Sequence, residues 1–383
     1  MSKTHISERI LALLWGKSAG RCEFTGCNIP LCRDTLTNKE FNNGQCAHII
    51  SDSPYGPRGD AKKSEQLKND LSNLILLCPT HHKLVDDNPG IYTVDKLLQM
   101  KNKHEQHIDY LTSFNDVNIQ SYIIIYCANI GKNNCPIVFN KVTEAVIADG
   151  MCPAERTPIE LSIGNSCTTD NKDKFWELEV DNLCSLYRSR VIPRIISKEI
   201  KHCSVFAFAP IPLLIKLGTL LTDQIEVNVY QKHREPDTWR WLEADDIEYS
   251  IIKPQKNCET VALNLSLSAT IPDDDIKQVC GKDVSIWKMT IDVPNNDYLK
   301  SKQHLRAFRE IYRKIMDDIK KTHGNNTKIH LFPAIPVSVA VELGRAYMPK
   351  ADLPIVIYDR NLSDKGQIFK KAIVIGDDNE VVE

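Results

Sequence analysis

The run KIHLFPAIPVSVAVELGRAYMPKADLPIVIYDR, residues 328–360, carries the pattern that decides the fold of most of this chain. Its first apolar segment ends in Phe332-Pro-Ala-Ile-Pro336 and runs into a helix, and a second apolar segment ends at Tyr358. Strand, helix and strand in this order predict a parallel α/β unit, because parallel neighbours need a long crossover between them.

An earlier stretch repeats this arrangement. Phe206-Ala-Phe-Ala-Pro210 also ends a strand and enters a helix, and the next strand, VNVY, ends at Tyr230. In each copy a glycine stands eight residues after the proline, at Gly218 and at Gly344. The copies lie 126 to 128 residues apart, which is too far for a solenoid repeat and suits two similar α/β halves.

Beyond residue 120, apolar strands alternate with helices. This alternation argues for a mainly parallel α/β sheet with helices on both faces. The predicted strands are 121–127, 203–209, 225–230, 259–268, 284–291, 328–332 and 354–358. The predicted helices are 173–189, 211–222, 299–323 and 337–347.

The composition is that of a globular protein. The chain has 383 residues, 48 Lys+Arg, 50 Asp+Glu and 42% hydrophobic residues, which suits two or three domains and excludes wholesale disorder. No window approaches about 18 uncharged apolar residues, and the N-terminus MSKTHISERI lacks an apolar signal core. We therefore expect no membrane insertion and a cytoplasmic location. The near-neutral charge argues against coating of nucleic acid by bulk charge.

The first 120 residues differ from the rest, since they hold five of the thirteen cysteines and six of the eleven histidines. Without a secretory signal we expect reduced thiols, some of them bound to metal. The predicted elements are a helix at 5–20, a turn-rich region at 22–69, a strand at 73–78, and helices from about 81 and at 94–114. A boundary near 114–120 predicts an α+β domain at 1–118 and an α/β domain at 119–383, with halves of about 119–250 and 251–383.

Two closely spaced pairs of metal-ligating residues follow the opening helix. Cys22-x4-Cys27 comes first, and Cys78-x2-His81 follows about fifty residues later. Three thiolates and one imidazole in two tight knuckles make a tetrahedral zinc site. A small loop-rich domain also needs such a staple, because its own core is thin. Cys32 and Cys46 are alternates for one ligand position.

A second cluster has a different composition. His48 lies in the phrase CAHII, Asn73 opens the strand NLILLC, and His82 comes directly after His81. Asp86 stands four residues past His82, so on a helix the two share a face and could hold one metal ion.

The phrases CAHII and NLILLCPTHHKLVDD, with the zinc pairs, resemble the HNH nucleases of ββα-metal fold over residues 20–90. The resemblance implies that His48 is the general base, a role that suits an imidazole with a pKa of about 6.5. It also implies that His82, with Asp86 as second ligand, holds Mg²⁺ or Mn²⁺. Asn73 either orients the base loop or touches the metal. Many members carry an Asp or His ligand where this chain has Ala47, which implies either a lower cation affinity or that Asn73 or Asp86 fills that place.

The region from 120 to 383 resembles SAVED domains, ligand sensors built from two fused CARF-like Rossmann units. HNH followed by SAVED is similar to the nuclease effectors of bacterial CBASS anti-phage defence. The resemblance implies an activating cyclic dinucleotide, such as 3′,2′-cGAMP, made by a CD-NTase. The resemblance also implies that binding of this ligand assembles a resting dimer into a tetramer or higher homo-oligomer, which then cleaves double-stranded DNA.

Ligands of open α/β sheets bind beyond the carboxyl ends of the strands, where helix N-termini offer N–H groups to anions. Pro210 and Pro336 occupy that place in the two copies, and Ser338 adds a hydroxyl. The candidate stacking partners for bases are Tyr230, Trp239, Trp241 and Tyr358, and the candidate phosphate partners are Arg234, Arg240 and Arg360. No GxGxxG or Walker A sequence appears, which disfavours ordinary NAD or ATP use.

Residues 1–120 hold 14 Lys+Arg and 14 Asp+Glu, so a single nuclease module should hold DNA poorly and gain from assembly. Two other functions remain open. One is a zinc-containing DNA-binding regulator with a small-molecule sensor domain. The other is a constitutive restriction-type HNH nuclease, which we rank lower because the doubled α/β region suits a small molecule.

Overall fold

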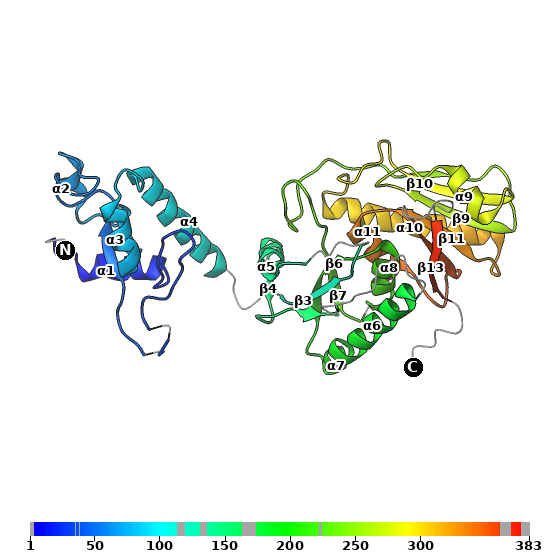
Figure 1. Ribbon diagram of the computed structural model, residues 1–383, viewed down its shortest axis with the longest axis horizontal. Coiled ribbons are helices and arrows are strands. Elements are labelled where there is room, and N and C mark those ends of the chain that lie inside the picture. Colours follow the sequence, from blue (N-terminus) through cyan, green and yellow to red (C-terminus); the bar gives the residue numbers. More distant parts are fainter. Residues whose placement is uncertain are drawn as a thin grey trace. The chain divides into compact units, whose positions relative to one another are not determined.

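The computed structural model describes residues 4–34, 36–37, 39–112, 119–130, 136–162, 174–221, 224–360 and 369–376. The chain divides into two compact units, Met1–Val117 and Asn118–Glu383 (Figure 1). Most of the predicted boundary at 114–120 lies outside the described residues. Among the described helices, none combines the length and the apolarity that crossing a bilayer requires.

The first unit packs helices around a pair of short antiparallel strands that a long connection joins. Its elements are α1 (Glu8–Lys17), β1 (Gln45–His48), α2 (Lys63–Leu67), the 3-10 turn η1 (Leu71–Asn73), β2 (Leu74–Leu77), α3 (Pro79–Asp87) and α4 (Val94–Thr112). β1 and β2 are antiparallel, with His48 opposite Leu74. All four residues of β2 are buried, and they form the centre of a core that includes Leu14, Val85 and Leu97.

Helix α3 begins two residues before its predicted start at His81. Pro79 occupies the first turn, where its missing N–H and fixed φ cost nothing, and the Cys78 side chain accepts a hydrogen bond from the backbone N–H of His81. The short apolar strand therefore passes directly into the helix that carries His81, His82 and Asp86.

The second unit contains two sheets. The first has five parallel strands: β4 (Cys152–Pro153), β3 (Gln120–Cys127), β6 (His202–Phe208) and β7 (Glu226–Val229) in that order, with β5 (Ile159–Glu160) also paired to β3. Its helices are α5 (Phe139–Ala148), α6 (Phe175–Arg190), α7 (Ile192–Ile196) and α8 (Ile211–Leu220). Ile123 and Ile125 pack against α5, whereas Ile124 and Tyr126 point into the main core.

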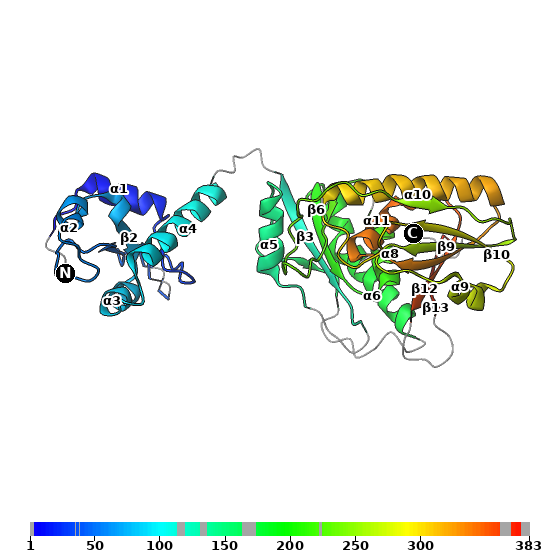
Figure 2. The same cartoon turned by 90° about the horizontal axis from the view of Figure 1, so that it is seen from above.

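The second sheet has six strands in the order β13-β12-β11-β9-β10-β8. These are β8 (Ser250–Ile252), β9 (Thr260–Ser266), β10 (Val284–Thr290), β11 (Ile329–Ala334), β12 (Ile355–Arg360) and β13 (Phe369–Ile375), with helices α9 (Asp273–Cys280), α10 (Lys302–His323) and α11 (Val337–Ala346). The four inner strands are parallel and the two edge strands are antiparallel. Figure 2 shows α10 along one face of this sheet and α9 on the other.

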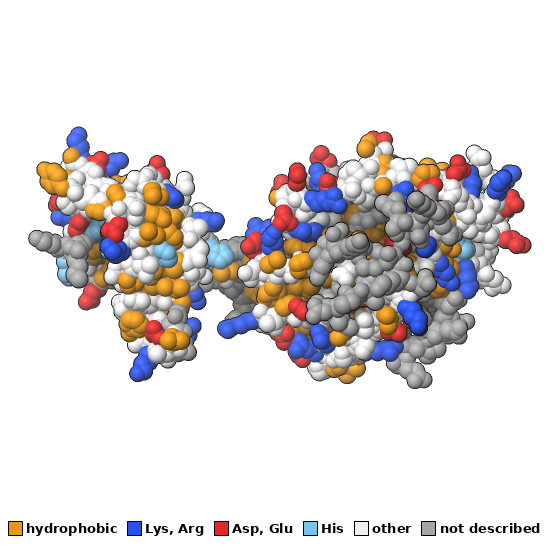
Figure 3. Space-filling view, viewed as in Figure 1, with side chains coloured by type: hydrophobic (Ala, Val, Ile, Leu, Met, Phe, Trp, Pro, Cys, Tyr) orange, Lys and Arg blue, Asp and Glu red, His pale blue; other side chains and the backbone are white. Residues whose placement is uncertain are grey.

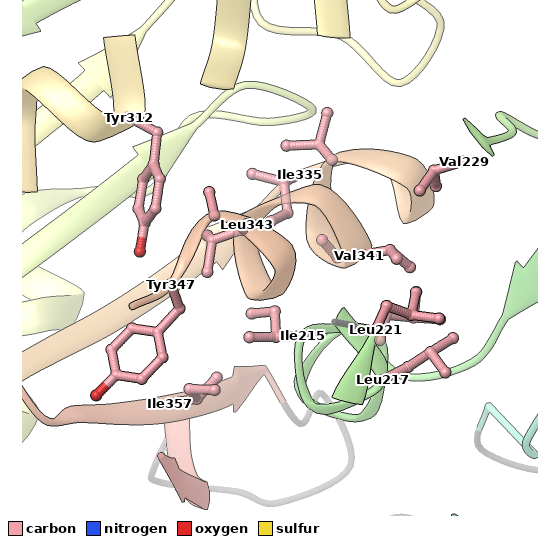
Figure 4. Packing of buried hydrophobic residues seen from close by; sticks show 14 of the residues in the cluster. Ile215, Leu217, Leu221, Val229, Tyr312, Ile335, Val341, Leu343, Tyr347 and Ile357 are labelled. Atoms are coloured by element: carbon pink, nitrogen blue, oxygen red, sulfur yellow. The ribbon is translucent and has the colours of Figure 1, made fainter. Parts of the chain in front are cut away.

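Helices α8 and α11 pack against each other at the two repeated glycines. A Cβ on Gly218 would stand 2.8 Å from the Cα of Gly344, and a Cβ on Gly344 would stand 2.8 Å from the Cα of Gly218. Ile215 and Leu217 of α8 and Leu343 of α11 lie around this contact (Figure 4). The glycines that the sequence repeat aligns are therefore the point where the two helix backbones touch.

The predicted strands and long helices of this region are present within a few residues. The sequence pattern missed α5, α7 and α9 and the short or edge strands β4, β5, β8 and β13. Strands of two or three residues carry too little periodicity to detect, and α9 buries only Ile276.

Candidate metal and nuclease sites

Cys22, Cys27, Cys78 and His81 come together in the first unit, with their ligand atoms within 4.8 Å of one another. The His81 Nδ1 lies 3.7 Å from Cys22 Sγ and 3.1 Å from Cys78 Sγ. Tetrahedral zinc with ordinary bond lengths places sulfur and nitrogen about 3.6 Å apart. The donor set and its spacing therefore fit one zinc ion. Cys32 and Cys46, the alternates, are not in this group.

The local fold fixes each member of this group. Cys22 precedes a tight turn in which Gly26 and Asn28 take positive φ angles of 86° and 50°. The ring of Phe24 stacks on His81 with centroids 4.0 Å apart and planes within 7°, which holds the imidazole in place. Burial raises the pKa of the Cys22 thiol to about 12, so ionisation of this thiol depends on a cation that replaces its proton.

His48, at the end of β1, is 8% exposed, and its Nε2 lies 2.9 Å from the backbone carbonyl of Lys68. A carbonyl oxygen only accepts hydrogen bonds, so Nε2 carries the hydrogen. The neutral ring then has its lone pair on Nδ1. This is the nitrogen that can accept a proton from water.

Asn73 is buried and uses its amide to hold the segment after His48. Its Oδ1 accepts from the N–H of Ile50 at 2.8 Å, and its Nδ2 donates to the carbonyls of Ile50 at 2.9 Å and Leu67 at 3.3 Å. Of the two roles left open for Asn73, this geometry favours orientation of the base loop over contact with a metal.

His82 and Asp86 lie one turn apart on α3, with Nε2 of the imidazole 3.5 Å from Oδ2 of the carboxylate. The other oxygen, Oδ1, accepts from Nη2 of Arg58 at 2.7 Å. A guanidinium already neutralises this carboxylate, which weakens its case as a direct metal ligand. His82 is the partly exposed donor that remains for a divalent cation, and Mg²⁺ ordinarily completes such a site with waters and substrate phosphates.

Arg58 is the residue of this site that the sequence analysis missed. It lies in the loop SDSPYGPRGD between β1 and α2, and its side chain is 3% exposed. Its guanidinium also contacts the carbonyls of Ile49 and Val85. The only sequence signal was an arginine among turn residues after CAHII, and nothing in the pattern pointed to its distant partners.

The predicted ligand residues of the second unit have mixed surroundings. Pro210 and Pro336 cap α8 and α11 as expected from their position. Ser338 is buried, and both its N–H and its hydroxyl donate to Gln231 Oε1, at 3.3 and 2.7 Å. Its hydroxyl therefore joins α11 to the segment that follows β7 rather than standing free.

Most of the predicted stacking rings are packed in the core. Tyr230 stacks on Phe206 and Tyr358 on Phe332, with centroids 4.4 and 4.6 Å apart. Rings so enclosed have no free face for a base, which argues against stacking roles for these two tyrosines. Trp239 is also buried, whereas Trp241 is partly exposed and Arg234, Arg240 and Arg360 lie on the surface.

A hollow of about 220 Å³ opens beside Trp239, near the carboxyl end of β6. Phe208 and Trp239 supply part of its apolar lining, and Lys141 and Lys232 approach it while paired with Asp237. It therefore lies beyond the carboxyl end of an inner parallel strand, where ligands of open α/β sheets usually bind.

Comparisons with known families identify both units. Residues 22–88 match the model of the HNH endonuclease family, and residues 186–375 match SAVED, the SMODS-associated and fused to various effectors sensor domain. The class of protein is therefore a nuclease domain joined to a sensor domain. More particularly, the chain carries an HNH endonuclease domain followed by a SAVED domain, the pair of domains that was expected of a CBASS effector.

Solved structures give more distant matches. The Acinetobacter baumannii Cap4 SAVED/CARF-domain containing receptor with the cyclic trinucleotide 2′3′3′-cAAA is 13% identical, with a TM-score of 0.42, covering 82% of this chain and 66% of that one. The Moraxella osloensis Cap4 receptor is 10% identical, with a TM-score of 0.37, covering 82% and 66%. The chain thus spans just under two thirds of the length of these receptors. No curated protein matches it significantly.

Proposed function

We propose that this protein is a CBASS-type effector, a divalent-metal-dependent HNH endonuclease of the bacterial cytoplasm that cleaves double-stranded DNA when its SAVED domain binds a cyclic dinucleotide. The observation that carries the proposal is the imidazole of His48, fixed in one tautomer beside the helix of His82 in a chain that also matches a sensor family. We propose domain limits of 1–118 and 119–383, the second with halves of about 119–250 and 251–383.

The chemistry follows from groups already described. His48 accepts a proton from water at Nδ1 while the carbonyl of Lys68 holds Nε2–H. Asn73 keeps the segment after His48 in place through Ile50. His82 is the proposed ligand of Mg²⁺ or Mn²⁺, and when bound the cation stabilises charge on the phosphate and the leaving oxygen. In this proposal Asp86, expected as the second ligand, and Asn73, for which a ligand role was one of two alternatives, act as supports.

The zinc site has a structural role in this proposal. Cys22, Cys27, Cys78 and His81 connect the turn after α1 to the junction of β2 and α3. Closed sites of three thiolates and one imidazole leave no position for a substrate. Zinc there would fix the helix on which His82 lies.

Assembly is the proposed switch. In Figure 3 the basic side chains on the visible face of the first unit are scattered among acidic and hydrophobic ones. With 14 Lys+Arg and 14 Asp+Glu in residues 1–120, one copy gains little from release of counterions. Several linked copies raise the effective concentration of each at the same duplex. A resting dimer that becomes a tetramer or larger would therefore turn a weak nuclease into an active one.

The test is plasmid cleavage with Mg²⁺ across a panel of cyclic di- and trinucleotides, with light scattering to follow the mass of the oligomer. We expect cutting and growth of the oligomer only with a cognate cyclic dinucleotide. His48→Ala should lower cleavage by about 10²–10⁴-fold while ligand binding and zinc content stay unchanged. Equal cutting without any ligand would favour a constitutive nuclease. A wild-type protein that binds DNA without cutting it, and whose DNA binding is unchanged by His48→Ala, would favour a regulator.

A further inference from the structure

Arg58 makes contacts that a surface loop residue would not ordinarily make. Its Nε donates to the carbonyl of Ile49 at 2.8 Å and its Nη1 to the carbonyl of Val85 at 2.6 Å. Its Nη2 donates to Asp86 Oδ1 at 2.7 Å and to the carbonyl of His48 at 3.4 Å. The first and last of these acceptors are at the end of β1, and the other two are on α3.

A guanidinium is a rigid plane whose N–H groups diverge at fixed angles. When one plane binds both elements, the separation between them is set by the plane and not by flexible side chains. β1 ends at the proposed general base, and α3 carries the proposed cation ligand. Arg58 thus sets the spacing between the strand that ends at the proposed general base and the helix that carries the proposed cation ligand.

The backbone conformation of the loop around Arg58 directs its side chain toward these acceptors. Arg58 itself has a φ of +58°, in the left-handed region that non-glycine residues seldom occupy. On either side, a Cβ on Gly56 would stand 2.8 Å from Ser51 Cβ, and one on Gly59 would stand 2.6 Å from the carbonyl oxygen of Ser53. A side chain that is 3% exposed at a strained backbone position indicates that its contacts repay the strain.

We propose that Arg58 is the positioning residue of the nuclease site, fixing His48 relative to His82 and holding Asp86 so that its second oxygen faces His82 Nε2. Asp86 then orients the ring and leaves Nδ1 of His82 for the cation, as carboxylates commonly do for metal-binding histidines. This inference rests on the proposed function, since it assigns a role within the same site.

The variant that tests it is chosen by the backbone. Arg58→Gly removes the side chain and relieves the positive φ, whereas Arg58→Ala would keep the strained backbone and lose the contacts that offset it. We expect Mn²⁺ binding to the full chain, measured by calorimetry, to weaken by about 10–100-fold, and cleavage to fall by a similar factor. Ethylguanidinium should restore both, because it can refill the vacated fork. Ethylammonium, with the same charge and no planar fork, should not.

Two further variants separate positioning from folding. By itself, Asp86→Asn should weaken Mn²⁺ binding. When it is combined with Arg58→Gly it should cause little additional loss of affinity, because both residues act on His82. Arg33, an exposed arginine in the loop before β1, supplies the control, and Arg33→Gly should leave Mn²⁺ affinity unchanged.

Unchanged Mn²⁺ affinity in Arg58→Gly would overturn the inference. So would ethylguanidinium that restores the melting temperature of this variant without restoring its Mn²⁺ binding. A wild-type protein that binds Mn²⁺ but never cleaves DNA would instead overturn the proposed function. The Mn²⁺ measurement therefore reports on Arg58 even if the substrate proves different.

Discussion

The chemistry of His48 depends on a single backbone carbonyl. Because the carbonyl of Lys68 can only accept, it selects the tautomer whose lone pair is on Nδ1, and burial of the ring keeps that choice from being lost to solvent. Lys68 contributes through its main chain, so replacement of its side chain should matter little for this bond.

Asn73 provides a prediction that separates its two possible roles. Asn73→Asp replaces the donor Nδ2 by an oxygen that faces the carbonyls of Ile50 and Leu67. We expect a loss of stability of about 1–3 kcal/mol and reduced cleavage, with no gain in Mn²⁺ affinity. Calorimetry and chemical denaturation would measure both quantities. Tighter Mn²⁺ binding in this variant would show that position 73 ligates the metal after all.

At the scale of single residues, the sequence predicted which chemical groups come together better than it predicted how each side chain is packed. The spacing within Cys22-x4-Cys27 and Cys78-x2-His81 was enough to find a quartet that the fold brings together. Tyr230 and Tyr358 were candidates for a ligand site only because a strand-end tyrosine has the same sequence pattern whether or not another ring covers it. Arg58 was missed because its partners lie 9 to 28 residues away and are mostly carbonyls.

Among elements, the junction between β2 and α3 is the most heavily used. Four buried residues of β2 lead directly into Cys78 and His81, so core packing and the proposed zinc site constrain the same few residues. Helix α3 then presents His82 directly after His81, and Asp86 one turn further on.

Removal of zinc should therefore disturb the nuclease site as well as the core of its unit. With Cys27→Ser, or with a strong chelator, we expect loss of about one zinc per chain and faster hydrogen exchange in β2 and α3. Exchange in the second unit should remain unchanged and serves as the internal control. Retained protection in β2 after the metal has left would contradict a structural role for zinc.

The contact between α8 and α11 makes a second prediction at this scale. Gly218→Ala or Gly344→Ala places a Cβ against the opposite backbone, which cannot move aside as a side chain can. We expect each to lower the free energy of unfolding of the second unit by about 1–3 kcal/mol. Gly16→Ala is the matched control, since Gly16 is in helix α1 with open space around its Cα and should tolerate the change.

The elements themselves were largely predictable because most are long and strongly periodic. The edge strands β8 and β13 were not, since β13 has the sequence FKKAIVI, in which two lysines interrupt the apolar run. Their antiparallel direction follows from pairings far apart in the chain, which no local pattern encodes.

Across the whole molecule, stability should depend on pH through histidines of the second unit that are buried or half-buried. Desolvation lowers the pKa of His202, His233 and His330, so the folded protein favours their neutral forms. It then binds fewer protons than the unfolded chain. The stabilisation is present above the ordinary value of about 6.5 and is lost as pH falls through the lowered folded values.

We therefore expect a lower melting temperature of the second unit at pH 5.5 than at pH 7.5. His202→Asn should reduce this difference, because an amide does not titrate between these pH values and can still hydrogen-bond the Ser121 hydroxyl, which lies 2.8 Å from His202 Nδ1. Scanning calorimetry at the two pH values would measure the effect. An identical pH dependence in the variant and the wild type would exclude His202 as a contributor.

The meeting of Gly218 with Gly344 has a consequence for how the sensor can be taken apart. A chain broken between β7 and β8 would yield two fragments. Each would carry one of the two glycine-containing helices and expose the apolar face that packs against the other fragment. We expect such fragments to be insoluble when produced alone and to recombine when produced together, as a tagged fragment pulling down its untagged complement would reveal. The same break with alanine at either glycine should weaken the association of the two fragments.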